Sequence, residues 1–206
     1  MKPILLFDID RTLFDTDSFS KSYKSKFIKF FNTTPDKFEK IRSKYHDSLA
    51  KNTDYVPEEY FKHLVNSFHR DKQRDTYEKL HNLFYETENF SKNLYPEIVS
   101  CLKELKNRYL LGIFSEGYPP YQKIKLSKSS IYDYFDLKYI FIARRKTESH
   151  FLSTLPEECT IVDNDQMVID ELFKQKSAFL NLIWINRKNK DKHPLSRTIY
   201  SLKDLV

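Results

Sequence analysis

Glycine is nearly absent from this sequence of 206 residues, which contains only Gly112 and Gly117. The two common phosphate-binding loops are each built on closely spaced glycines, because glycine lets the backbone approach the phosphate. Two glycines cannot form a glycine-rich loop of either type. A phosphate site in this protein therefore has to be built from other groups.

Cysteine is equally scarce, since only Cys101 and Cys159 occur. They lack the spacing of metal ligands and are too few for a disulfide framework. No run approaches the roughly 20 apolar residues of a membrane helix, and acidic residues interrupt the N-terminal apolar run before any signal-peptide cleavage site. With 40% hydrophobic and 31% charged residues, the sequence is typical of a globular protein, which we expect in the cytoplasm and without a membrane partner.

The net charge of +6 permits anionic partners but does not identify one. Basic residues are spread along the chain and mixed with acids. The one dense basic patch is "RKNKDKH", from Arg187 to His193, which we interpret as solvated surface. No recognisable nucleic-acid motif accompanies it, so we do not expect nucleic acid as the main partner.

Hydrophobic patterning divides the chain into two domains. Residues 1–15 and 92–206 contain apolar strands that alternate with amphipathic helices, which indicates an α/β core with a Rossmann-like parallel sheet. Residues 16–91 instead have aromatic and aliphatic residues at helical spacing throughout. Pro35 and Pro57, each with acids in the following turn, indicate two helix starts there. We therefore predict an all-helical domain inserted into the α/β core.

Polar residues gather where the predicted strands end. They are Asp8, Asp10 and Thr12 after the first strand, Ser115 and Glu116 after the second, Arg144, Arg145 and Lys146 after the third, and Asp163, Asn164 and Asp165 after the fourth. Ligands of open α/β sheets bind outside the carboxyl ends of the strands. The residues Asp8 and Asp10 lie two positions apart, so their side chains can face one pocket. We therefore predict a single polar site at this edge of the sheet.

In this order, the residues resemble the four motifs of the haloacid dehalogenase-like superfamily. The resemblance matches Asp8, Asp10 and Thr12 to its DxDxT motif, Ser115 to the hydroxyl of the second motif, Lys146 to the lysine of the third and Asp163 to the acid of the fourth. The stretch "FSEGYPPYQKIKLSKSSIYDYFD" is also similar to the family's passage after the second motif. The predicted helical domain resembles the cap that one large branch of the family has at this place.

Three stretches depart from the family's pattern. Glu116 stands where asparagine is usual, "RRKTES" replaces the familiar "GKPDP" around Lys146, and the fourth motif reads "VDNDQMVID". The third motif leaves open whether Arg144 or Arg145 shares the role of Lys146. The fourth leaves open which of Asn164, Asp165 and Asp170 supports Asp163.

The resemblance implies a Mg²⁺-dependent phosphatase that acts on a small phosphorylated metabolite. Asp8, Asp163 and the backbone carbonyl of Asp10 are then the expected Mg²⁺ ligands. Asp8 would attack phosphorus to form an aspartyl-phosphate, and Asp10 would act as general acid and base. The groups expected to bind the substrate are Thr12, Ser115, Glu116, Lys146 and the backbone N–H groups from Ile9 to Asp10 and from Glu116 onward.

Asp10 distinguishes activities within the family. Dehalogenating members resemble this chain but lack the second aspartate, because a departing halide needs no proton. The presence of Asp10 therefore favours hydrolysis of a phosphate ester, or phosphoryl transfer between sugar positions. Two alternatives remain: a binding or scaffold protein with weak catalysis, which the altered surroundings of Lys146 suggest, and a phosphatase acting on nucleic-acid ends, which the basic patch suggests.

Overall fold

The chain folds into two compact units. In the computed structural model, residues 2–49, 54–68, 73–176 and 180–206 are described. The first unit comprises residues 1–16 and 94–206, and the second comprises residues 17–93. We call them the α/β unit and the helical unit.

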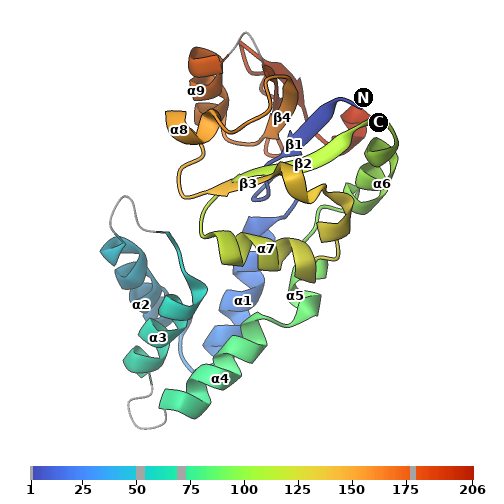
Figure 1. Cartoon of the computed structure of the whole chain (residues 1–206). Coiled ribbons are helices and arrows are strands. Elements are labelled where there is room, and N and C mark those ends of the chain that lie inside the picture. The colour runs from blue at the N-terminus through green and yellow to red at the C-terminus, as the bar shows by residue number, and fades with distance from the viewer. Residues whose placement is uncertain (1, 50–53, 69–72, 177–179) are drawn as a thin grey trace. The chain divides into compact units, whose positions relative to one another are not determined.

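The α/β unit is built on a parallel sheet of six strands in the order β3-β2-β1-β4-β5-β6 (Figure 1). The strands are β1 (Ile4–Phe7), β2 (Leu110–Glu116), β3 (Ile140–Ala143), β4 (Cys159–Asp163), β5 (Leu180–Ile185) and β6 (Arg197–Ile199). This confirms the predicted Rossmann-like α/β class. The short strand β6 is an addition, because the sequence analysis assigned no strand to these residues.

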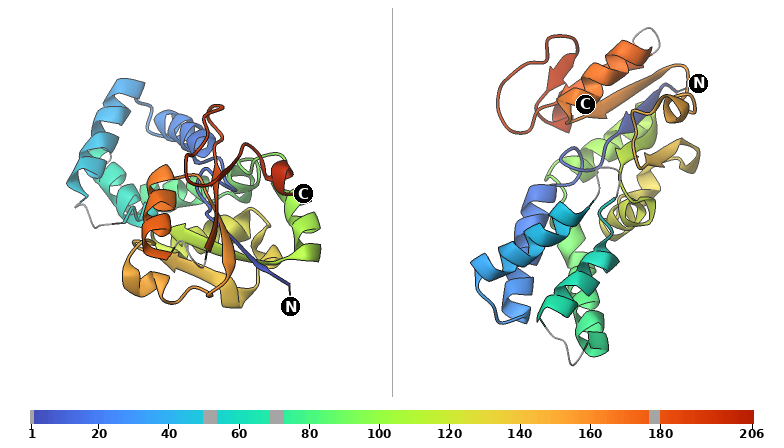
Figure 2. Two further views of the ribbon diagram at one scale, coloured as in Figure 1. Left: turned by 90° about the horizontal axis from the view of Figure 1, so that it is seen from above. Right: turned by 90° about the vertical axis from the view of Figure 1, so that its left-hand side faces the viewer.

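Helices cover both faces of this sheet. They are α6 (Ile98–Arg108), α7 (Pro119–Lys128), α8 (Ser149–Leu152) and α9 (Gln166–Lys176), with the 3₁₀ helices η1 (Tyr132–Tyr134), η2 (Leu137–Tyr139) and η3 (Leu202–Leu205). Figures 1 and 2 show α8 and α9 on one face and α6 and α7 on the other. The apolar side chains of α8 and α9 form one core with alternate residues of the strands, such as Leu6, Phe114 and Ile161. The central strands are therefore buried on both faces, as parallel strands require.

The chain reverses direction across the sheet beside β1. From β1 it proceeds outward to β2 and β3, and then it returns to form β4 on the other side of β1. Such a reversal opens a crevice at the carboxyl ends of the two strands that flank it. The strand order thus places the end of β1 next to the end of β4, where Asp8 and Asp163 lie.

The helical unit consists of α-helices with an aromatic core. They are α1 (Thr16–Phe30), α2 (Pro35–Ser48), α3 (Pro57–Phe68), α4 (Gln73–Phe84) and α5 (Thr87–Ser91). Phe61 and Phe84 lie edge to face with ring centroids 5.0 Å apart, and Phe27 lies 6.1 Å from each. Pro35 and Pro57 begin α2 and α3, as predicted. No helix in the described ranges is both long and apolar enough to span a membrane.

The predicted basic surface patch is wrong for its two ends. Arg187 keeps only 9% of its side chain exposed, in an ion pair with Glu97, and His193 is buried beside Trp184. Both residues stabilise the C-terminal part of the α/β unit. The lysines between them, Lys188, Lys190 and Lys192, are exposed.

Gly112 allows β2 to approach its neighbours closely. A Cβ atom at this position would lie 2.4 Å from the carbonyl oxygen of Tyr139 and 2.6 Å from Cδ2 of Leu6. We expect Gly112→Ala to lower the free energy of unfolding by about 2 kcal/mol, because the backbone of η2 would have to shift. Urea denaturation would measure the change. The matched control, Ser127→Ala on the exposed side of α7, should change it by less than about 0.5 kcal/mol, and equal effects of the two substitutions would contradict this account.

Candidate active site

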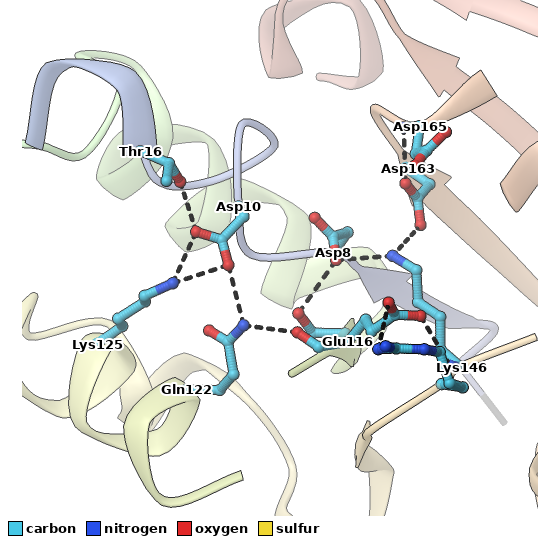
Figure 3. Close-up of polar contacts among 11 residues, drawn as sticks. Asp8, Asp10, Thr16, Glu116, Gln122, Lys125, Lys146, Asp163 and Asp165 are labelled. Carbon is cyan, nitrogen blue, oxygen red and sulfur yellow. Dashed lines mark hydrogen bonds and ion pairs between the residues drawn. The ribbon is translucent and has the colours of Figure 1, made fainter. Parts of the chain in front are cut away.

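Four strands bring their carboxyl ends to one edge of the sheet, and a polar cluster forms there (Figure 3). Asp8 follows β1 directly, and Ser115 is the penultimate residue of β2. Lys146 follows β3, and Asp163 is the last residue of β4. All four are buried: Asp8 is 4% exposed, Lys146 is 4% exposed, and Ser115 and Asp163 are fully covered. The structure therefore brings together residues that the sequence separates by up to 155 positions.

The ammonium group of Lys146 connects the two buried carboxylates. Its Nζ lies 2.8 Å from Oδ1 of Asp8 and 2.6 Å from Oδ2 of Asp163. The hydroxyl of Ser115 also donates to Oδ1 of Asp8, at 3.1 Å. The backbone N–H of Asp165 donates to the second oxygen of Asp163, at 2.9 Å. The positions of both carboxylates are therefore determined by the backbone and by one shared cation.

The charge of Lys146 does not offset the cost of burying two carboxylates. Burial raises the pKa of Asp8 to about 7; the nearby charge of Asp163 also raises it, and Lys146 only partly opposes the shift. Burial alone would lower the pKa of Lys146, but the carboxylates of Asp163 and Asp8 outweigh it and raise that pKa. Burial therefore disfavours the ionised form of Asp8, and a further positive charge beside it would favour that form.

A magnesium ion suits this cluster chemically. The described residues contain no group of three or more His, Cys, Asp and Glu side chains arranged around a cation. Mg²⁺, however, commonly takes only one or two protein carboxylates and completes its shell with waters and phosphate oxygens. The Asp8 and Asp163 carboxylates lie beside the same ammonium group and supply hard oxygen donors, so these residues fit the ion.

Asp10 lies in a separate set of hydrogen bonds. The Nζ of Lys125 is 2.7 Å from both of its carboxylate oxygens, Nε2 of Gln122 is 2.9 Å from Oδ2, and Thr16 donates to Oδ1. Burial would raise the pKa of Asp10, but the charge and hydrogen bonds of Lys125, with those of Thr16 and Gln122, lower it to about 2. Asp10 is therefore ionised, which is the form that a general base requires.

A tight turn holds the segment that follows Asp10. The backbone N–H of Leu13 donates to the carbonyl of Ile9 at 3.0 Å, and Nε and Nη2 of Arg187 donate to the carbonyl of Thr12 at 3.0 and 2.7 Å. Another nitrogen of Arg187 lies 2.8 Å from Glu97. The hydroxyl of Thr12 is fully buried and makes no hydrogen bond within the described ranges. Nothing in this geometry supports substrate binding by Thr12, which stays a prediction.

The cations after β3 have different environments. Lys146 is the one that contacts Asp8, whereas Arg144 is exposed and Arg145 pairs with Glu116 at 3.2 Å. The other oxygen of Glu116 accepts from the backbone N–H of Lys146, also at 3.2 Å. The unusual glutamate thus connects β2 to the segment that carries Lys146. Just beyond it, the N–H of Gly117 donates to Ala143 at 2.9 Å, so that backbone group is already engaged.

The side chains of Asp165 and Asp170 contact groups other than Asp163. Asp165 is exposed, and its side chain accepts from the N–H of Met167 at 2.9 Å, in the first turn of α9. Asp170 lies 3.3 Å from His193, and the carbonyl of Asn164 accepts from Trp184 at 3.0 Å. Only Asp165 has a hydrogen bond to Asp163 among these three candidates, and it does so through its backbone.

Sequence reasoning missed the partners of Asp10. Thr16, Gln122 and Lys125 received no role, although the spacing of Gln122 and Lys125 places both on one face of a helix. That helix follows directly on the second site strand, which is the signal that was available. The contact of Arg187 with Thr12 spans 175 positions, and no local pattern indicates it.

The sequence has a recognisable relationship to one protein family. A family model described as haloacid dehalogenase-like hydrolase matches residues 5–152. No curated protein matches the sequence.

Solved structures share this fold across nearly the whole chain. A candidate haloacid dehalogenase-like hydrolase from Burkholderia xenovorans has 20% identity, with 98% of this chain and 94% of that one covered and a TM-score of 0.70. The candidate hydrolase YfnB from Bacillus subtilis, solved with magnesium, has 17% identity, coverage of 99% and 96%, and a TM-score of 0.66. A candidate β-phosphoglucomutase from Thermotoga maritima has 15% identity, coverage of 98% and 96%, and a TM-score of 0.62. Dehalogenases are also among the similar folds.

Removing the shared cation should expose the repulsion between the buried carboxylates. We expect Lys146→Met to lower the free energy of unfolding at pH 8 by about 3 kcal/mol, because Asp8 and Asp163 lose their counter-charge. Lys146 lowers the pKa of Asp8, so without it burial and the charge of Asp163 raise that pKa further above its unfolded value. The deficit is therefore present at high pH and shrinks as Asp8 is protonated toward pH 5. Denaturation at both pH values would measure this. Lys123→Met, at an exposed position of α7, is the control, and a deficit independent of pH would disprove the explanation.

Proposed function

This chain belongs to the haloacid dehalogenase-like hydrolase family, and from its site we propose that it is a Mg²⁺-dependent phosphatase acting on a small phosphorylated metabolite. One observation carries the proposal. Asp8 is buried where β1 and β4 end, in contact with the Lys146 ammonium and the Ser115 hydroxyl and close to a second carboxylate, Asp163. These are the groups that an aspartate needs in order to attack a phosphoryl group.

In the first step, a carboxylate oxygen of Asp8 attacks phosphorus, and the bond from phosphorus to the leaving oxygen breaks. Lys146 and Ser115 already lie beside this carboxylate. Their N–H and O–H groups can donate to the phosphoryl oxygens, where charge is spread in the transition state. Because the cluster is buried, these interactions operate without competition from water. Asp8 and Asp163 would hold Mg²⁺, which would neutralise charge on the phosphoryl oxygens.

In the second step, water attacks phosphorus and the bond to Asp8 breaks, which releases inorganic phosphate and restores the carboxylate. The carboxylate of Asp10 takes the proton of that water. Asp10 is ionised because Lys125 and its other hydrogen-bond partners lower its pKa, so it is ready for this step. The first step differs, because a poor leaving group needs a proton that ionised Asp10 does not hold. An aryl phosphate leaves without such help and is therefore the substrate to test first.

Asp10 is also the reason to prefer a phosphatase to a dehalogenase. Halide departure needs no proton, so a dehalogenase has no use for a second aspartate that transfers protons. In this protein three side chains form hydrogen bonds with Asp10. Phosphoryl transfer between sugar positions uses the same groups, and a similar fold is described as a β-phosphoglucomutase. We favour hydrolysis, because the ionised state of Asp10 suits the activation of water.

We expect the wild type to release phosphate from p-nitrophenyl phosphate in the presence of Mg²⁺, and Asp8→Asn to lower kcat by at least about 10³-fold. The amide cannot attack phosphorus, so no phosphoenzyme forms. The production of nitrophenol, measured by absorbance, provides the assay. Asp133→Asn, at an exposed position of the same unit, is the matched control and should keep full activity.

Other outcomes of the same assay discriminate between functions. Turnover in Asp8→Asn would rule out the aspartyl-phosphate route. Chloride release from 2-chloropropionate without phosphate release would indicate a dehalogenase. Binding of inorganic phosphate without turnover of any phosphate ester in a broad panel would favour the scaffold alternative.

Magnesium should also stabilise the fold independently of activity. We expect saturating Mg²⁺ to raise the melting temperature of the wild type by roughly 3–6 °C, because a ligand that binds only the folded state stabilises it. Asp163→Asn should show less than about a third of that shift, since it replaces one of the two carboxylates. Thermal denaturation with and without Mg²⁺ would measure this. A full shift in Asp163→Asn, with Asp133→Asn as reference, would remove Asp163 from the metal site.

A further inference from the structure

Helix α7 directs two buried polar side chains toward Asp10. Gln122 and Lys125 are three residues apart, so they lie on the same side of the helix. Each is only 4% exposed. Lysine and glutamine on a surface helix normally extend into water, and burial of an ammonium group is costly unless it is paired. Their orientation therefore requires a compensating interaction, and Asp10 provides it (Figure 3).

Lys125 contacts the whole carboxylate of Asp10. Its Nζ lies 2.7 Å from Oδ1 and 2.7 Å from Oδ2. The same ammonium lies 4.6 Å from the ring centroid of Tyr121 and 5.8 Å from that of Phe14. The cation is therefore in contact with two carboxylate oxygens and near two aromatic rings. Rotation of the Asp10 carboxylate about its Cβ–Cγ bond would lengthen at least one of the two short contacts.

Gln122 restricts Asp10 from a second direction. Its Nε2 donates to Oδ2 of Asp10 at 2.9 Å and to the backbone carbonyl of Glu116 at 2.7 Å. Both partners are acceptors, so the amide nitrogen must point toward them. The other amide atom, Oε1, is buried and has no hydrogen-bond partner in the described part of the chain. Gln122 therefore keeps an orientation that leaves one of its own polar atoms unsatisfied in order to connect Asp10 to the end of β2.

We propose that Lys125, assisted by Gln122, is the positioning residue that orients the Asp10 carboxylate for proton transfer. The proposal rests on the proposed phosphatase function. In this role neither Lys125 nor Gln122 touches the substrate, and both act through Asp10. Displacement of a catalytic group by about 1 Å can lower a rate by about 100-fold. The effect should therefore appear in kcat and leave substrate binding largely unchanged.

The first test compares Lys125→Met with the wild type on p-nitrophenyl phosphate and on an alkyl phosphate. Methionine preserves most of the length and apolar volume of the side chain but removes the ammonium group. We expect kcat to fall by about 30- to 100-fold, while KM changes by less than about threefold. Lys123→Met, exposed on the same helix, is the matched control. Unchanged kcat in Lys125→Met, or a loss confined to KM, would overturn the proposal.

A double-mutant cycle decides whether Lys125 acts through Asp10. The four proteins are the wild type, Lys125→Met, Asp10→Asn and the double variant. If Lys125 only positions Asp10, its removal should cost less than about twofold in the Asp10→Asn background, because residues that act as a unit are not additive. Multiplicative losses would overturn the proposal. The melting temperatures of the four proteins give a second readout without catalysis: Lys125→Met should lower this temperature less in the Asp10→Asn background.

Gln122→Met provides a second variant in case Lys125→Met fails to fold. It removes the donor to Asp10 without adding charge, and we expect a kcat loss of about 5- to 20-fold that also vanishes in the Asp10→Asn background. Persistence of the loss there would overturn the proposal. Failure of the wild type to release phosphate would refute the proposed function instead, whereas normal wild-type turnover with unaffected Lys125 and Gln122 variants would refute only this inference.

Discussion

The arrangement at the edge of the sheet depends on a single ammonium group shared by two buried carboxylates. Lys146 contacts Asp8, directly after β1, and Asp163, the last residue of β4, at 2.8 and 2.6 Å. These strands are neighbours because the chain reverses its direction across the sheet beside β1. Two like charges would otherwise separate these strand ends or be protonated. The cation makes their proximity tolerable, but it does not offset the burial of Asp8, whose pKa stays raised. A divalent metal ion beside Asp8 would favour its ionised form.

A second cation offsets the repulsion between Asp8 and Asp10, which lie only two positions apart. Asp10 has its own partner in Lys125, so the two aspartates have distinct environments. Burial raises the pKa of Asp8, whereas the charge of Lys125 outweighs burial and lowers that of Asp10. Carboxyl groups whose environments shift their pKa values in opposite directions can perform different tasks. This separation is consistent with one aspartate acting on phosphorus and the other on protons.

Much of the site was accessible from the sequence because the rule that applies is local. A polar residue that directly follows an apolar strand of a parallel sheet lies at the ligand-binding edge, and Asp8, Ser115, Lys146 and Asp163 all satisfy it. The rule cannot say which cation reaches which acid. Lys146 and Arg145 are adjacent in sequence, yet one contacts Asp8 and the other Glu116. Likewise, Arg187 looked like exposed surface, because its partners Glu97 and Thr12 are 90 and 175 positions away.

By itself, the sequence determined the α/β class, the inserted run of helices and the acids at the strand ends. Each of these follows from short-range periodicity, which is set by backbone geometry. Only the tertiary structure decided the strand order, the sharing of Lys146 between two carboxylates and the convergence of Lys125 and Gln122 on Asp10. These depend on contacts between separate segments of the chain, up to 138 positions apart for Lys146 and Asp8. The energy of such contacts is a property of burial and neighbouring charge, which no local pattern contains.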